Sequence, residues 1–63
     1  MTKSETREAT KAIAYGQTLG ADYMARALSA LIRSARTAKS RNELITIAAG
    51  YPAVTQSPEF IIG

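Results

Sequence analysis

The residue types that carry most enzyme chemistry are sparse in this chain of 63 residues. It contains no His and no Cys, so the usual general base and thiol nucleophile are absent, as are the ligands of most zinc, copper and iron sites. Of the carboxylates, only Glu5 and Glu8 are neighbours on one helical face, in a first turn where acidic residues support the helix dipole. No spacing places a Ser–Lys dyad. The sequence therefore predicts a protein that is not an enzyme, with no catalytic residue, no cofactor and no metal.

The basic residues form a dense pattern in the run RSARTAKSR, where no acidic residue interrupts them. The ridge of positive charge comprises Arg26, Arg33, Arg36, Lys39 and Arg41. On a helix such a ridge can contact the backbone phosphates of a nucleic acid, each contact adding to the salt dependence. The alternative that we favour is a solvated face whose cations stabilise a helix C-terminus, because a basic patch alone does not establish a specific site.

A helix-turn-helix motif is suggested by the run NELITIAAGYPAVTQSPEF, in which a helical pattern leads into a Gly turn. Its recognition helix would occupy about residues 53–61, with Pro58 in the interior at a cost of about 3 kcal/mol. The positions that should reach bases offer Thr55 and Gln56 but no Arg, Lys or Asn. We therefore reject this motif and expect any nucleic-acid binding from the basic ridge.

Hydrophobic periodicity predicts an all-α protein in which two amphipathic helices position these charges. The first is expected over about residues 4–20, after a capping box that begins at Thr2 or Ser4. The second is expected over about residues 22–39, with the basic ridge opposite an apolar stripe.

A short third helix is expected over about residues 41–50, after a second capping box that begins at Ser40. Gly50 stands where a left-handed C-terminal cap belongs, and Pro52 follows as a terminator. The rest is expected to be an extended tail or a single helical turn. It closes with three apolar residues that need cover, Phe60, Ile61 and Ile62.

Two glycines interrupt the helical pattern in the run GQTLG, and two interpretations remain open. In the first, Gly20 ends the first helix, because the apolar stripes before and after it differ by roughly 80° if the helix is unbroken. In the second, the helix continues at a cost of about 1 kcal/mol for each interior Gly. The rotated stripe favours a break or kink. In both, Ala12 and Gly16 offer a smooth face that suits another helix.

The size of the chain favours association with a partner. A domain this small buries only about 60% of the surface that its unfolded chain exposes, and small proteins without disulfides or metals usually gain stability from a partner. We therefore expect one helical domain, residues 1–63, acting as a non-catalytic interaction or regulatory module in an oligomer or a larger assembly. The expected association residues are Ala12, Gly16, Gly20, Tyr23, Phe60, Ile61 and Ile62. A self-sufficient monomer with its tail folded back is the alternative.

The net charge of +3 also allows a polyanionic partner, so nucleic acid remains the alternative to a protein partner. Charges run through the first eleven residues, so we expect no signal peptide. Pro52 and Pro58 break the weakly charged region 44–63, so we expect no membrane span and a cytoplasmic location. In size and style the chain resembles accessory proteins of bacteriophages and mobile elements.

Overall fold

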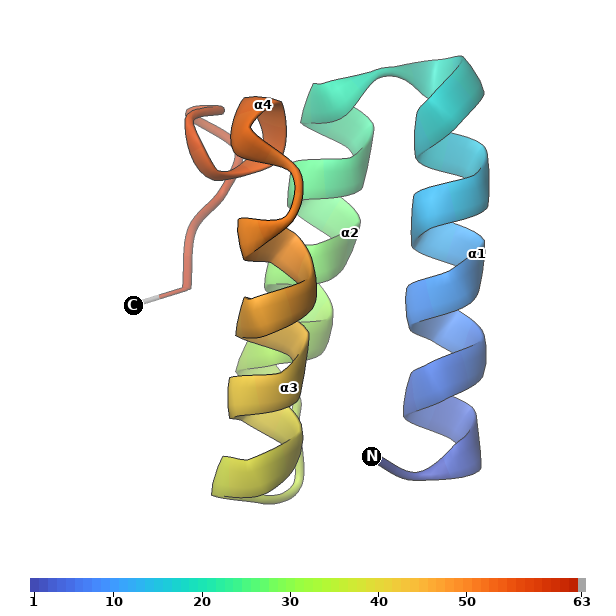
Figure 1. Ribbon diagram of the computed structural model, residues 1–63, viewed down its shortest axis with the longest axis vertical. Coiled ribbons are helices and arrows are strands. Elements are labelled where there is room, and N and C mark those ends of the chain that lie inside the picture. Colours follow the sequence, from blue (N-terminus) through green and yellow to red (C-terminus); the bar gives the residue numbers. More distant parts are fainter. Residues whose placement is uncertain (63) are drawn as a thin grey trace.

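Four helices make up the described part of the chain, residues 1–62 of the computed structural model (Figure 1). They are α1 (Lys3–Leu19), α2 (Ala21–Arg33), α3 (Ala38–Ala49) and α4 (Pro52–Thr55). The central helix is α2, since α1, α3 and α4 all pack against it. The all-α fold class is therefore confirmed. None of the described helices combines the length and the apolar character needed to cross a bilayer.

The first helix begins at a capping box on Thr2. The backbone N–H of Glu5 donates to Thr2 Oγ1 over 3.1 Å, and the N–H of Thr2 donates to Glu5 Oε1 over 2.8 Å. These two bonds satisfy backbone donors that the first helical turn leaves unpaired. The cap is thus Thr2 rather than Ser4.

A single glycine separates α1 from α2. Gly20 adopts φ 105° and ψ 169°, a region that is essentially restricted to glycine. Its N–H donates to the carbonyl of Gly16 over 2.9 Å, and its own carbonyl accepts from the N–H of Met24 over 3.2 Å. The predicted break is confirmed, and the interpretation as one continuous helix is wrong.

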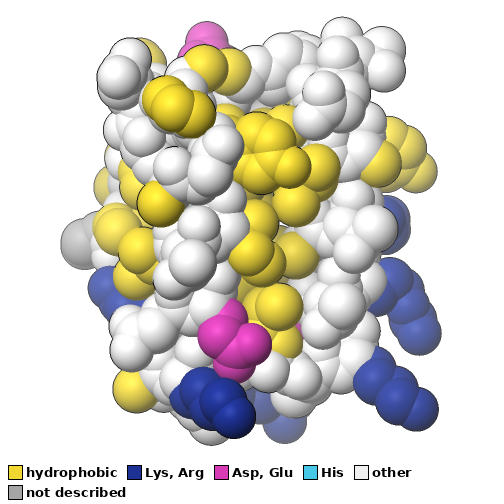
Figure 2. Space-filling model, in the orientation of Figure 1, with side chains coloured by type: hydrophobic (Ala, Val, Ile, Leu, Met, Phe, Trp, Pro, Cys, Tyr) yellow, Lys and Arg dark blue, Asp and Glu magenta, His cyan; other side chains and the backbone are white. Residues whose placement is uncertain are grey.

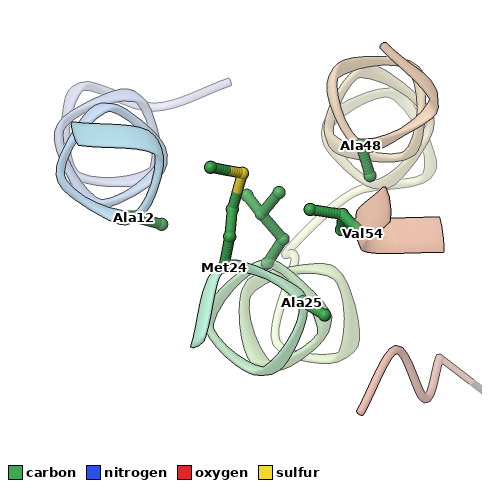
Figure 3. Close-up of a cluster of buried hydrophobic side chains, with 6 residues drawn as sticks. Ala12, Met24, Ala25, Ala48 and Val54 are labelled. Carbon is green, nitrogen blue, oxygen red and sulfur yellow. The ribbon is translucent and has the colours of Figure 1, made fainter. Parts of the chain in front are cut away.

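Small residues on α1 bring it close to α2. Ala9, Ala12 and Gly16 are buried on one face of α1. A Cβ atom on Gly16 would lie 2.5 Å from Cε and 2.8 Å from Cβ of Met24. Figure 3 shows Met24 reaching from α2 into the space between α1 and the segment that carries Ala48 and Val54. The smooth face of α1 therefore does meet another helix, and that helix is α2.

The boundary between the second and third helices differs from the prediction. The second helix ends at Arg33 rather than near residue 39, and α3 begins at Ala38. Its cap is Thr37, whose Oγ1 accepts from the N–H of Ser40 over 3.0 Å. The expected cap Ser40 lies inside the helix and is buried. The loop between α2 and α3 contacts α1, because the N–H of Arg36 donates to a carboxylate oxygen of Glu5 over 3.4 Å.

One further expectation about the end of α3 was wrong and another was incomplete. Gly50 has φ −73° and ψ −5°, which is right-handed and not the expected left-handed cap. Pro52 opens α4 instead of only terminating α3, a position where its missing N–H costs nothing. The chain therefore turns over α2 through a short helix before the tail begins.

The tail folds back on the helices. Phe60 packs against both buried clusters of the core, and Ile62 packs against the cluster of Ala9, Ile32 and Leu44. The folded chain exposes 4066 Å², close to the roughly 3,900 Å² typical of a monomer of this mass.

Two serines fix the position of this tail. The buried Ser29 hydroxyl accepts from the N–H of Ile61 over 3.0 Å and donates to the carbonyl of Glu59 over 3.4 Å. The hydroxyl of Ser57 donates to Asp22 Oδ1 over 2.6 Å. Both serines thus join the tail to α2, so the expected extended tail is an ordered part of the fold.

Candidate functional site

The residues expected to associate with a partner separate into two groups. Ala12 and Gly16 are covered by α2, and Phe60 and Ile62 dock on the protein's own helices. These four residues therefore make contacts within the chain, and the expectation that they also face a partner stays a prediction. Gly20 and Ile61 are exposed and Tyr23 is half-buried.

A hollow of about 400 Å³ lies where the end of α1, the start of α2 and the segment 50–54 meet. We call it the groove. Met24, Tyr51 and Val54 supply apolar lining, and no charged side chain is among the described residues around it. Figure 2 shows hydrophobic side chains along the middle of this face, between α1 and α3. Gly16 and Gly20, two of the expected association residues, line the groove. The sequence did not predict the hollow itself, because its walls come from separate helices.

One flank of α1 extends this uncharged surface. Thr6, Thr10, Ile13 and Gln17 lie within about 60° of one another around an ideal helix. Gln17 lines the groove, which places this flank beside it. At the other end of the same face, the N-terminal amine of Met1 forms an ion pair of 3.3 Å with Glu43. An uncharged strip therefore runs along α1 and ends at this ion pair.

The predicted basic residues are all exposed or half-buried at most, but they do not form one helical ridge. Arg33 ends α2, Arg36 lies in the loop, and Lys39 and Arg41 lie at the start of α3. Arg26 stands apart and forms an ion pair of 3.5 Å with Glu59. A single ridge on one helix is therefore a wrong expectation, because the loop after α2 redirects the chain.

The loop nevertheless gathers positive charge at one end of the molecule. The start of α1, the end of α2 and the start of α3 all lie at the lower end in Figure 1. The sequence prediction missed Lys3 and Arg7, which α1 brings to this end. We call the set the basic end: Lys3, Arg7, Arg33, Arg36, Lys39 and Arg41. On the face in Figure 2, the Lys and Arg side chains likewise gather in the lower half.

The carboxylates of this end interact within the chain. Glu5 completes the cap of α1 and also accepts the N–H of Arg36. The Thr2 N–H at its carboxylate lowers the pKa of Glu5 below the ordinary value. Glu8 pairs with Lys11 at 3.8 Å, and Glu43 pairs with the Met1 amine. Glu5 was predicted to support its helix, and in the structure it does so as the N3 residue of a capping box.

None of the basic-end side chains forms an ion pair within residues 1–62. Arg41 does use one nitrogen internally, since its Nη2 donates to the carbonyl of Ile62 over 3.2 Å. Over the same residues, no three acidic side chains come together as a potential metal site. Comparison of the chain with models of protein families, with characterised proteins and with solved structures finds no match.

Proposed function

We propose that this protein is a non-catalytic association module that binds a second copy of itself through the groove. The observation that carries the proposal is the uncharged groove together with the uncharged flank of α1 beside it. A two-fold symmetric interface uses the same patch on both copies, so one patch must supply both a cleft and the element that fills it. Here the groove is the cleft, and α1 of the other copy is the element.

The distribution of charge supports an antiparallel pairing of the two copies. The basic end lies at one end of the long axis, whereas Asp22 lies in the first turn of α2 at the opposite end. An antiparallel arrangement sets the basic end of each copy beside the end of the other that carries Asp22. This pairing reduces repulsion between two chains of net charge +3.

Apolar contacts would contribute most of the binding free energy. Ile13 is only partly buried on α1, and Tyr51 is only partly buried beside α4. Burial of apolar surface contributes about 25 cal/mol per Å² before the entropic cost of association is subtracted. We therefore expect a reversible dimer whose population depends on concentration.

Light scattering coupled to size-exclusion chromatography over a micromolar concentration series tests the proposal. The wild-type mass should rise with concentration towards twice 6.7 kDa. Gln17→Arg places a charge in the groove and should hold the protein at the monomer mass. Thr18→Arg is the matched control, because Thr18 is exposed on the same helix and does not line the groove.

Two results would overturn the dimer. One is a wild-type mass of 6.7 kDa at every concentration. The other is an equal loss of dimer in the Gln17→Arg and Thr18→Arg variants, which would separate association from the groove. Circular dichroism of both variants checks that each keeps its helices.

A further inference from the structure

We infer that the basic end is a second binding surface, which takes the phosphodiester backbone of a duplex nucleic acid. The argument for this surface does not use the proposed dimer, because the residues of the basic end and those of the groove lie at opposite ends of one copy. The cations come from three helix ends and one loop, so the fold and not a single run of sequence assembles the surface.

The first step is that these charges are available. The six side chains of the basic end are exposed, and none is neutralised by an ion pair within residues 1–62. Each acidic residue of the same end, Glu5, Glu8 and Glu43, already bonds a group of the chain itself. Counting these residues together with the N-terminal amine gives seven positive and three negative charges, a net of +4. Without the amine, six positive against three negative side chains give +3, which equals the formal side-chain charge of the whole chain.

The second step is the fit to a duplex. The principal extents of the molecule are 27 × 22 × 16 Å, so the end of its long axis measures about 22 × 16 Å. Duplex DNA carries one phosphate charge per about 1.7 Å of its axis. A 16 Å surface therefore spans roughly nine phosphates counted over both strands, and the basic end can contact those on the facing side of the duplex.

The third step excludes the other polyanions. Binding of single strands uses exposed aromatic side chains as stacking platforms. Tyr15, Tyr23 and Tyr51 lie on the other half of the molecule, and Phe60 packs on the core. An amphipathic helix that inserts into a membrane surface places apolar side chains beside its cations. The large hydrophobic side chains that residues 1–62 expose are Tyr15, Leu19 and Ile61, from the second half of α1 and the tail.

Contacts to the phosphodiester backbone predict the sequence dependence and the salt dependence of binding. Contacts to phosphates position a protein on a duplex but carry no sequence information. Binding should therefore be independent of sequence and should weaken as salt rises.

Fluorescence anisotropy measures the affinity of the protein for labelled random-sequence duplex DNA across a salt series. The double variant Arg33→Ala/Arg36→Ala should bind more weakly, and its salt slope should fall by about one for each phosphate that the variant no longer neutralises. The matched control is Lys11→Ala/Arg26→Ala, which removes two exposed cations outside the basic end and should leave the slope unchanged. Lys3→Ala/Lys39→Ala is a second test pair on different helices, in case the first does not fold.

Further arms of the same experiment identify the ligand. Duplex RNA should bind comparably, because the contacted group is shared. No binding to a duplex at low salt would overturn the inference, as would equal losses in the test and control variants. Tighter binding to single-stranded oligothymidine would overturn the assignment to a duplex. Binding to phosphatidylglycerol vesicles without binding to a duplex would replace nucleic acid by a lipid surface.

Discussion

The two ends of this molecule hold their helices together by different means. At the end near Gly20, α1 and α2 meet through backbone dihedral angles and through contact between Gly16 and Met24. At the basic end, threonine side chains cap α1 and α3, and Glu5 links the first helix to the loop. The first end depends on shape and the second on polar bonds. The first should therefore respond to side-chain volume, and the second to pH, salt and removal of single hydrogen bonds.

The basic end also contains a contrast between its two helix starts. The first turn of α1 carries Glu5, which the helix dipole favours. The first turn of α3 has no acidic residue, and Lys39 and Arg41 lie at its start. Cations near a helix N-terminus cost a few tenths of a kcal/mol up to about 1 kcal/mol. Lys39 and Arg41 therefore make the start of α3 less stable than uncharged or acidic residues at the same positions would.

The largest effect should come from Gly16→Leu at the shape-dependent end. Its Cβ alone would overlap Met24, with 2.8 Å to the Cβ of that residue. Overpacking of this kind costs about 1–3 kcal/mol, and we expect the upper end of that range or more. Urea unfolding followed by circular dichroism measures the change in stability.

Gly16→Ala sharpens this prediction, because two effects oppose each other. Alanine gains about 1 kcal/mol of helix propensity over glycine, yet its Cβ meets the same neighbour. We expect the steric overlap to dominate and the variant to be destabilised. A Gly16→Ala protein more stable than wild type would show that α1 can move away from α2 and that the close approach is not restrictive.

An intermediate effect should come from Thr37→Ala at the polar end. The substitution removes the acceptor of the Ser40 N–H and should cost about 1 kcal/mol. A destabilisation of this size lowers the melting temperature by about 4–8 °C in a domain this small. Thermal unfolding measures the decrease, and Ser34→Ala is the control, because the Ser34 hydroxyl bonds the carbonyl of Leu31 at the end of α2 and not α3. An equal or larger decrease in Ser34→Ala would contradict the cap.

The smallest effect should be the pH dependence that Glu5 confers. Its pKa is lower in the folded protein, so between the folded and unfolded values the unfolded state binds more protons. Stability in that window therefore rises with pH. The contribution of Glu5 is fully present above the ordinary value of about 4.3 and is lost as pH falls through the lowered value.

Glu5→Gln should consequently flatten the acid limb of the stability profile and leave its shape at neutral pH unchanged. Urea unfolding at a series of pH values from acid to neutral measures the free energy of unfolding that makes up this profile. Glu8→Gln is the control, since Glu8 is exposed and lies one turn along the same helix. If both variants keep the wild-type slope below the ordinary glutamate pKa, the link between Glu5 and Thr2 does not affect stability.

Features that depend on the local chain could be predicted from the sequence. The break at Gly20 follows from a backbone conformation that glycine alone adopts readily. Thr2 was one of two predicted caps, and the Glu three residues later completes its capping box. The start of α3 could not be predicted in this way. Thr37 and Ser40 are comparable caps locally, and what separates them is tertiary: Arg36 bonds Glu5, and Ser40 is buried.

The candidate site shows the same division. The positive charge of the run RSARTAKSR is visible in the sequence. That Lys3 and Arg7 lie at the same end of the molecule depends on the direction in which α1 packs on α2. The small residues Ala12 and Gly16 predict a face that meets a helix, and this prediction is confirmed. The helix that covers them could not be predicted, because periodicity identifies an apolar face without identifying what covers it.

The bond between Ser29 and the tail sets a constraint on chain length. Phe60 and Ile62 pack inward while Ile61 between them is exposed, and the N–H of Ile61 is the group that Ser29 holds. Moving the tail by one residue would turn Ile61 inward and both neighbours outward. Apart from Ser57 and Phe60, the segment between α4 and Ile61 should therefore accept substitutions but no single-residue insertion or deletion. Across related chains, its length should vary less than its amino acids.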